Sequence, residues 1–362
     1  MIGGTQPVLL QSMCATKTTD IAATAQMATM LFEAGAGLVR VAVDTKRDAA
    51  ALREISQQTP ARLSVDLHEN HKLAELVAPF VKKIRYNPGH LHHIDPEISW
   101  QDKVKHIAEI AGENGCALRI GVNCGSLDPA KKSHDDGSID NLPLLASTLE
   151  HAAFLDSIGF VDYCVSLKSS DPYMVIQANR EFARRRPDVP IHLGLTEAGM
   201  PPEAVLKSRA ALEPLLVEGI GDTLRVSLTV PNERKIEEIE AGRLILENVS
   251  AGNVMTPDQL QLPRLNIISC PSCSRVENGA FVELAEKIRA ATRFAVDYPI
   301  NIAIMGCRVN GPGETDKADL GIWCGTMQAN LKRGETLIGS FDYDKIIPRL
   351  LKELRQMIDF TG

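Results

Sequence analysis

The chain has 362 residues, enough for about two domains or for one large barrel with a small addition. Hydrophobic residues make up 44% and charged residues 23%, which excludes global disorder, while a net charge of −7 and 4% aromatic residues argue against nucleic-acid binding. No apolar run approaches the roughly 18–20 residues of a membrane span and the start lacks a secretory signal, so we expect a cytoplasmic protein.

Short apolar runs rich in β-branched residues alternate with helical segments between residues 7 and 230. The runs are Val8–Met13, Leu38–Val43, Leu63–Leu67, Lys83–Tyr86, Ala117–Val122, Tyr163–Leu167, Ile191–Leu195 and Leu224–Leu228. The predicted helices are Asp20–Glu33, Asp48–Gln57, Trp100–Asn114, Leu142–Ser157, Pro172–Arg185 and Asn232–Val249. Strands that alternate with helices pair in parallel, and eight such units favour an α/β fold with an eight-stranded TIM-type barrel over an open Rossmann-like sheet.

The sequence after the barrel segment has a different pattern. Residues 251–264 have the composition of a linker. After them, we predict strands at 265–269, 300–305 and 320–324, a hairpin around Gly334, and helices at 279–292 and 345–358. We therefore divide the chain into a TIM barrel (1–250), a linker (251–264) and a small α+β domain (265–362). The polar stretch 124–141 predicts a mobile loop, equally compatible with a lid and with a plain surface excursion.

Polar side chains follow the predicted barrel strands at their carboxyl ends, where such barrels carry reactive groups. Strand alternation points five cations inward: Arg40, Arg85, Arg119, Lys168 and Arg225. Like charges are not gathered in a buried pocket without a compensating anion, and the guanidinium fork suits phosphate oxygens, so we predict a phosphorylated substrate. The alternative for any one arginine is an outward orientation or a pair with Asp44, Asp66 or Glu197. Asp66, His68 and Glu197 are candidate proton-transfer groups, although such carboxylates often serve only as structural partners of arginine.

Eight cysteines in a chain without a secretory signal are poorly explained by a disulfide framework. Cys270 and Cys273 form a CxxC pair after one apolar run, and Cys307 follows another. This spacing suits zinc and an iron–sulfur cluster equally, and a redox disulfide less well. The fourth ligand stays open between Cys324 and Glu314. The other cysteines are expected to be small core residues: Cys14, Cys116, Cys124 and Cys164.

Motifs along nearly the whole chain carry one more inference. They are IGGTQPVLLQSM, VRVAV, DLH, RYNPG, RIGVNCGSL, SLKSSD, HLGLTEAG, GIGDTLRVSLT, ISCPSCSR and GCRVNGPGE. The last two, combined with TEAG and DTLRVSL, are highly specific. Together these motifs closely resemble the 4-hydroxy-3-methylbut-2-enyl diphosphate synthase family, the iron–sulfur enzymes of the non-mevalonate isoprenoid pathway, in its bacterial two-domain form.

The resemblance implies both a reaction and a set of site residues. It implies two-electron reductive ring opening of 2-C-methyl-D-erythritol 2,4-cyclodiphosphate with loss of water, which yields 4-hydroxy-3-methylbut-2-enyl diphosphate. The implied ligands of a 4Fe–4S cluster are Cys270, Cys273, Cys307 and Glu314. The implied substrate-binding residues are Arg40, Arg85, Arg119, Asn123, Lys168, Arg225 and Ser227. Asp66, His68 and Glu197 would face the carbon skeleton as catalytic groups, with Glu197 expected to deliver a proton.

The resemblance also implies partners. In this family the cluster domain of one subunit caps the barrel of the other, which predicts a homodimer with a shared site, and electrons come from ferredoxin or flavodoxin. Asp44 departs from the family pattern, in which proline is common at this position. If Asp44 faces the site, it should offset one of the arginines.

Two rival interpretations keep parts of this argument. The first is a phosphosugar lyase or synthase on the same barrel, with an accessory domain held together by zinc; Cys324 is then the fourth ligand and Glu314 a loop residue. The second is a non-enzymatic binding module, which the polar groups at all eight strand ends disfavour. Iron, sulfide and zinc contents of the purified protein would separate these interpretations.

Overall fold

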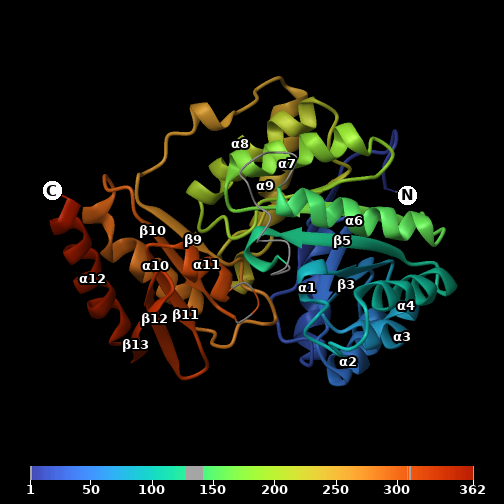
Figure 1. Ribbon diagram of the computed structural model, residues 1–362, viewed down its shortest axis with the longest axis horizontal. Helices are drawn as coiled ribbons and strands as arrows, with labels where there is room; N and C mark the ends of the chain where they lie inside the picture. The colour runs from blue at the N-terminus through green and yellow to red at the C-terminus, as the bar shows by residue number, and fades with distance from the viewer. Residues whose placement is uncertain (1, 128–141, 308, 310, 362) are drawn as a thin grey trace.

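The structure, a computed structural model, describes residues 2–127, 142–307, 309 and 311–361. Most of the predicted polar loop 124–141 lies outside these ranges. The described residues form two sheets, one of eight strands and one of five, in two units that lie side by side (Figure 1). Within the described ranges, no helix has both the length and the apolar character that crossing a membrane requires.

The eight-stranded sheet forms a nearly closed barrel. Its strands are β1 (Leu9–Met13), β2 (Leu38–Ala42), β3 (Leu63–His68), β4 (Lys83–Tyr86), β5 (Ala117–Asn123), β6 (Tyr163–Lys168), β7 (His192–Leu193) and β8 (Thr223–Leu224). They pair in parallel in the order β6-β5-β4-β3-β2-β1-β8-β7. A parallel bridge between Val165 and Ile191 joins the two ends of this order. The predicted eight-stranded TIM-type barrel is confirmed.

The helices of this unit pack around the barrel (Figure 1). They are α1 (Ile21–Glu33), α2 (Lys46–Gln58), α3 (Ala74–Val77), α4 (Trp100–Glu113), α6 (Pro143–Ser157), α7 (Pro172–Arg185), α8 (Glu203–Val217) and α9 (Glu237–Ser250). Side-chain caps start several of them, as where Asp20 accepts from the backbone N–H of Ala23. The sequence analysis missed α3, which is one turn long, and α8, whose interior Pro214 normally interrupts a helix.

Each barrel strand divides its side chains between two surroundings. In β4, Ile84 and Tyr86 are fully buried in the apolar core between sheet and helices. Lys83 and Arg85, which alternate with them, are also buried, and Arg85 lines a cavity at the barrel mouth. The apolar core therefore lies outside the sheet, and polar groups occupy the interior.

The second unit is built on the five-stranded mixed sheet. Its strands are β9 (Asn266–Ser269), β10 (Asn301–Met305), β11 (Leu320–Cys324), β12 (Gln328–Arg333) and β13 (Thr336–Asp342), and its helices are α10 (Phe281–Ala291), α11 (Gly311–Lys317) and α12 (Ile346–Thr361). The predicted small α+β domain is confirmed. Only α11 was not predicted, because Gly311, Pro312 and Gly313 have low helix propensity. Pro312 lies in the first turn, where proline is tolerated.

The second unit rests on the carboxyl-end rim of the barrel. Ser269 of β9 forms a parallel bridge with Ala198, and its hydroxyl lies 2.7 Å from that of Thr229. After the neighbouring strand β1, the Lys17 ammonium donates to the carbonyls of Ser274 (2.8 Å) and Val276 (2.7 Å). These contacts place the cysteine-bearing segment directly over the strand ends.

Candidate active site

The strand ends and the overlying cysteine segment enclose a cavity of about 100 Å³. Every predicted site residue except Glu314 lines this cavity: Arg40, Asp66, His68, Arg85, Arg119, Asn123, Lys168, Glu197, Arg225, Ser227, Cys270, Cys273 and Cys307. They come from strands β2 to β8 or the loops that follow them and from two segments of the second unit. Strand alternation therefore predicted which barrel side chains meet here.

Two of the five cations have carboxylate partners. Arg85 lies 2.9 Å from Asp66 and also donates to the carbonyl of Gly121 over 2.7 Å. Arg225 pairs with Glu238 at 3.2 Å. For Arg85, the alternative of a pair with Asp66 is correct in part, because Arg85 also faces the cavity. The partner of Arg225 is Glu238, which is not one of the three carboxylates that the sequence analysis considered.

The other three cations have no ion pair with a carboxylate among the described residues: Arg40, Arg119 and Lys168. The Arg119 side chain is 1% exposed, and its Nε and Nη1 atoms lack a hydrogen-bond partner in the described ranges. Burial, together with neighbouring Arg85, lowers the pKa of Arg119 to about 10. Burial and repulsion by Arg119 and Arg40 hold the pKa of Lys168 well below its ordinary value. This excess of buried positive charge suits an anion with several oxygen atoms.

Two glycines make room for these cations inside the barrel. A side chain at Gly121 would overlap Arg85 Nε, and a Cβ at Gly194 would lie 2.6 Å from Lys168 Nζ. Gly121 lies on β5 and Arg85 on β4, while Gly194 directly follows β7 and Lys168 is the last residue of β6. The absence of a side chain on one strand thus sets the position of a cation on another.

A buried network, missed in the sequence analysis, orients Arg225. Glu238 of α9 accepts from Arg225, from Lys235 at 2.8 Å and from the Ser12 hydroxyl at 2.8 Å. Burial by itself would raise the pKa of Glu238, but Arg225 and Lys235 lower it to about 2. The carboxylate is therefore ionised and holds two cations in place. A glutamate on the first turn of a helix gave no local sign of this role.

Asp66 and His68 are both tied to Arg85. Arg85 Nη1 lies 2.9 Å from Asp66 Oδ1 and 2.8 Å from His68 Nδ1. Although burial opposes it, Arg85 and Arg275 hold the pKa of Asp66 well below its ordinary value. Burial and the same two arginines lower the pKa of His68. Asp66 is therefore ionised, and His68 is neutral.

Three residues that line the cavity have a backbone conformation rare for side chains other than glycine. The φ angles are 57° at His68, 48° at Glu197 and 52° at Ser272. Such left-handed conformations cost free energy and are concentrated at functional sites. Glu197 is 3% exposed, and it lies close enough to Cys270 for its charge to influence that thiol. It therefore lines the cavity that the cations share and lies near one of the cysteines.

Three of the predicted metal ligands lie together. The Cys307 thiol donates to the Cys273 sulfur, which lowers the pKa of Cys273 to about 6. Burial, with the neighbouring Cys273, raises the pKa of Cys270 to about 12. Cys324, the reserve ligand of the zinc interpretation, is fully buried in the apolar core of the second unit and does not line the cavity. The four-cysteine set is therefore not met in this arrangement, because Cys324 does not line the cavity that the other three share.

Glu314 does not join these cysteines in the structure. It lies on α11, and a Cβ at Gly125 would come within 2.5 Å of its carboxylate. Burial raises the pKa of Glu314. Its carboxylate lines a separate cavity of about 950 Å³ together with Asp171 and Lys317. The prediction that Glu314 stands with the three cysteines is not met in this arrangement, because the helix directs it toward the barrel rim.

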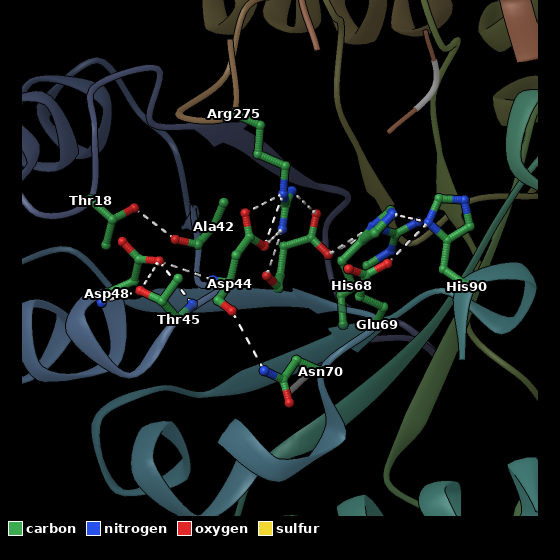
Figure 2. Close-up of polar contacts among 12 residues, drawn as sticks. Thr18, Ala42, Asp44, Thr45, Asp48, His68, Glu69, Asn70, His90 and Arg275 are labelled. Atoms are coloured by element: carbon green, nitrogen blue, oxygen red, sulfur yellow. Dashed lines mark hydrogen bonds and ion pairs between the residues drawn. The ribbon is translucent and has the colours of Figure 1, made fainter. Parts of the chain in front are cut away.

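Arg275, also missed in the sequence analysis, joins the second unit to the barrel. Its guanidinium lies 2.6 Å from Asp44 and 3.3 Å from Asp66, and Figure 2 shows it pointing into the strand ends beside Asp44. Asp44 therefore offsets an arginine, as expected, but the arginine belongs to the second unit. The signal was present in ISCPSCSR, two positions after Cys273.

Comparisons with known proteins agree with this geometry. Residues 1–243 match the family model described as the GcpE TIM-barrel domain, and residues 266–356 match the GcpE protein C-terminal domain. A 4-hydroxy-3-methylbut-2-en-1-yl diphosphate synthase (flavodoxin) of Rhodopirellula baltica is 57% identical over 357 residues, covering 99% of this chain and 94% of that protein. The chain belongs to the GcpE family.

Other GcpE relatives extend the match. The protein of the same name from Nautilia profundicola is 38% identical over 358 residues, covering 98% of this chain and 95% of the relative. The predicted family, its synthase function in isoprenoid biosynthesis and its enzyme class are confirmed. Among solved structures, dihydropteroate synthase from Stenotrophomonas maltophilia matches with a TM-score of 0.49 and 12% identity, covering 68% of this chain and 94% of that one.

Proposed function

We propose that the cavity binds the diphosphate of 2-C-methyl-D-erythritol 2,4-cyclodiphosphate and that the chain opens this ring reductively. The observation that carries the proposal is the positive charge of Arg40, Arg119 and Lys168, which line the cavity and form no ion pair with a carboxylate in the described part of the chain. The diphosphate ligands would be Arg40, Arg85, Arg119, Asn123, Lys168, Arg225 and Ser227. Two electrons and the matching protons enter, one carbon–oxygen bond to phosphate breaks, and a hydroxyl leaves as water.

The protonation of the site favours Glu197 as the proton donor. Asp66 is held ionised between two arginines, so it has no proton to give. His68 is neutral, and its proton is directed toward His90 rather than into the cavity. Glu197 lines the cavity that the cations share and lies near one of the cysteines. We therefore assign proton delivery to Glu197, and to Asp66 and His68 the orientation of Arg85.

Cys270, Cys273 and Cys307 fit a 4Fe–4S cluster, because three sulfur donors from two loops face one cavity beside the substrate cations. A bound cluster would supply the two electrons. Glu314 stays the proposed fourth ligand, and ligation requires α11 to turn its carboxylate away from Gly125. The three cysteines hold the group at the barrel mouth, while Lys17 and Thr229 anchor the segments that carry them.

The proposed partners are flavodoxin, which the names of the relatives give as their electron donor, or ferredoxin, and a second copy of the chain. In the structure the second unit contacts the barrel of its own chain. In a homodimer with a shared site, the partner's second unit would make these contacts instead, an exchange of identical elements. A cytoplasmic location stays a prediction from the sequence.

Purification without oxygen tests the proposal. We expect brown protein with about four irons and four sulfides per chain and little zinc, which converts the cyclodiphosphate when reduced flavodoxin is supplied. Cys273→Ser should lose the iron, whereas Cys324→Ala should retain it, because Cys324 lies in the core. Colourless protein that keeps zinc after anaerobic reconstitution would overturn the cluster, and iron-loaded protein without turnover would overturn the assigned reaction.

A further inference from the structure

Arg275 is the most heavily paired side chain between the two units. Its Nη2 donates to Asp44 Oδ1 over 2.6 Å, its Nε lies within 3.0 Å of both Asp44 oxygens, and its Nη2 also reaches the Asp66 carbonyl at 3.1 Å. The guanidinium is only 9% exposed. Figure 2 shows this fork-like contact between Arg275 and Asp44. Bidentate pairs between arginine and a carboxylate are among the strong charge-assisted hydrogen bonds.

The same arginine shares a carboxylate with the cation cluster. Asp66 accepts from Arg85 on one oxygen at 2.9 Å and from Arg275 on the other at 3.3 Å. Both arginines line the cavity assigned to the diphosphate. Arg85 belongs to β4 of the barrel, and Arg275 belongs to the segment 270–276, which we call the cysteine loop. The buried carboxylate of Asp66 thus forms ion pairs both with Arg85 of the barrel and with Arg275 of the cysteine loop.

This shared partner has an energetic consequence. Arg85 and Arg275 repel each other across Asp66, and a diphosphate that binds Arg85 offsets this repulsion, so that Asp66 holds Arg275 more firmly. Anion binding should therefore strengthen the attachment of the cysteine loop. By thermodynamic reciprocity, a docked loop should strengthen anion binding by the same factor.

We propose that Arg275, held by Asp44 and Asp66, is a positioning residue that couples docking of the cysteine loop to diphosphate binding in the barrel. The proposal rests on the proposed function, since it takes the cation cluster as the diphosphate site. Lys17, which binds the carbonyls of Ser274 and Val276, gives the loop a second attachment that does not involve Asp66. The loop therefore stays near the rim when the Arg275 contact is weakened.

Two substitutions separate this coupling from simple electrostatics. Asp44→Asn removes a negative charge, so charge balance alone predicts tighter anion binding, whereas loss of the coupling predicts weaker binding. Arg275→Lys keeps the charge but loses the planar fork, so charge balance alone predicts no change. Asp44 is about half exposed (45%), which makes its substitution compatible with folding.

The probe is inorganic pyrophosphate, titrated calorimetrically into the anaerobic, cluster-loaded full chain. We expect its Kd to rise by about five-fold or more in Asp44→Asn and in Arg275→Lys. Hydrogen exchange of residues 270–276 should slow on pyrophosphate addition in the wild type and change little in either variant. Arg289→Gln is the matched control, because Arg289 also joins the second unit to the barrel, through the Pro201 carbonyl, but does not line the cavity.

The outcomes separate the two proposals. Unchanged or tighter pyrophosphate binding in Asp44→Asn, with normal binding by the wild type, overturns the coupling and leaves the diphosphate site in place. A wild-type chain that does not bind pyrophosphate overturns the diphosphate site, and the coupling with it. An equal loss of affinity in Arg289→Gln overturns the specific role of Arg275 in favour of general contact between the units.

Discussion

Arg85 donates from Nη1 to Nδ1 of His68 over 2.8 Å, and this contact determines where the imidazole carries its proton. Because a guanidinium can only donate, Nδ1 of neutral His68 must accept, and the proton lies on Nε2. That nitrogen lies 2.7 Å from His90 Nδ1. Figure 2 draws the contact between the two imidazoles. The proton of His68 therefore points out of the cavity, which removes His68 as the resting-state acid.

Glu197→Gln should suppress turnover while leaving the iron content unchanged. The amide keeps the shape of the side chain but has no acidic proton, and loss of general acid catalysis typically lowers kcat by about 10²–10⁴-fold. His68→Gln should have a smaller effect on kcat, because it removes a partner of Arg85 rather than the acid. Steady-state kinetics and iron analysis check both. Full activity of Glu197→Gln would refute the assigned role.

Arg119→Met should stabilise the free protein and weaken substrate binding. Arg119 has no carboxylate partner among the residues that the structure describes, and replacing such a buried charge by an apolar side chain of similar volume is expected to raise the free energy of unfolding by about 1–4 kcal/mol. The loss of a charged hydrogen-bond donor to phosphate should raise KM by about 10-fold or more. Thermal melts and kinetics measure the two effects. Arg180→Met, which alters an exposed pair with Glu218, is the control for stability.

The stability of the chain should fall in acid through Glu238. Its folded-state pKa of about 2 lies below the ordinary value of 4.5, so its contribution is complete above about pH 4.5 and is lost as the pH falls toward 2. Glu238→Gln should cost about 3–5 kcal/mol at pH 7, because it leaves Arg225 and Lys235 buried without their counter-charge.

Urea unfolding across this pH window provides the measurement. The variant should lose less stability than the wild type between pH 4.5 and 2, because it has already lost this contribution. Glu237→Gln, at the neighbouring and more exposed position, is the matched control and should follow the wild type. Parallel pH curves for Glu238→Gln and the wild type would contradict the prediction.

A mixture of two inactive variants should recover activity if the site is shared in a homodimer. Glu197→Gln removes the proton donor on the barrel, and Cys273→Ser removes a cluster ligand on the second unit. A mixed dimer would therefore contain one intact site, formed by the unaltered barrel of one chain and the unaltered second unit of the other. Exchange of subunits in an equal mixture should restore about a quarter of wild-type activity. No recovery after demonstrated subunit exchange would show instead that each chain completes its own site, as the contacts within one chain permit.

The barrel was predictable from the sequence because its apolar strand faces and its helices both repeat locally. Successive side chains of a strand point to opposite faces of the sheet, which places Arg85 inside the barrel and Ile84 outside it. This alternation explains why so many site residues were assigned correctly to one cavity. The short α3 and the proline-containing α8 lack a strong local pattern. Their formation follows from packing on the barrel, which outweighs intrinsic propensity.

The contacts that were missed join residues far apart in the chain. Arg275 and Asp44 are separated by 231 positions, and no local period relates them. Glu314 was assigned by motif, but its direction depends on the formation of α11, whose glycines and proline predict a loop. Cys324 has an acceptable spacing for a ligand, and only the register of β11 shows that it faces the core.

Gly121 and Gly194 define how far this pocket can be redesigned. A methyl group at Gly121 would displace Arg85, and with it the hydrogen bond to His68 and the pair with Asp66 that continues to Arg275. A change of one methyl group on β5 would therefore reach the cysteine loop without altering any charged residue. Gly121 and Gly194 therefore limit how far the pocket can be altered to accept a different substrate.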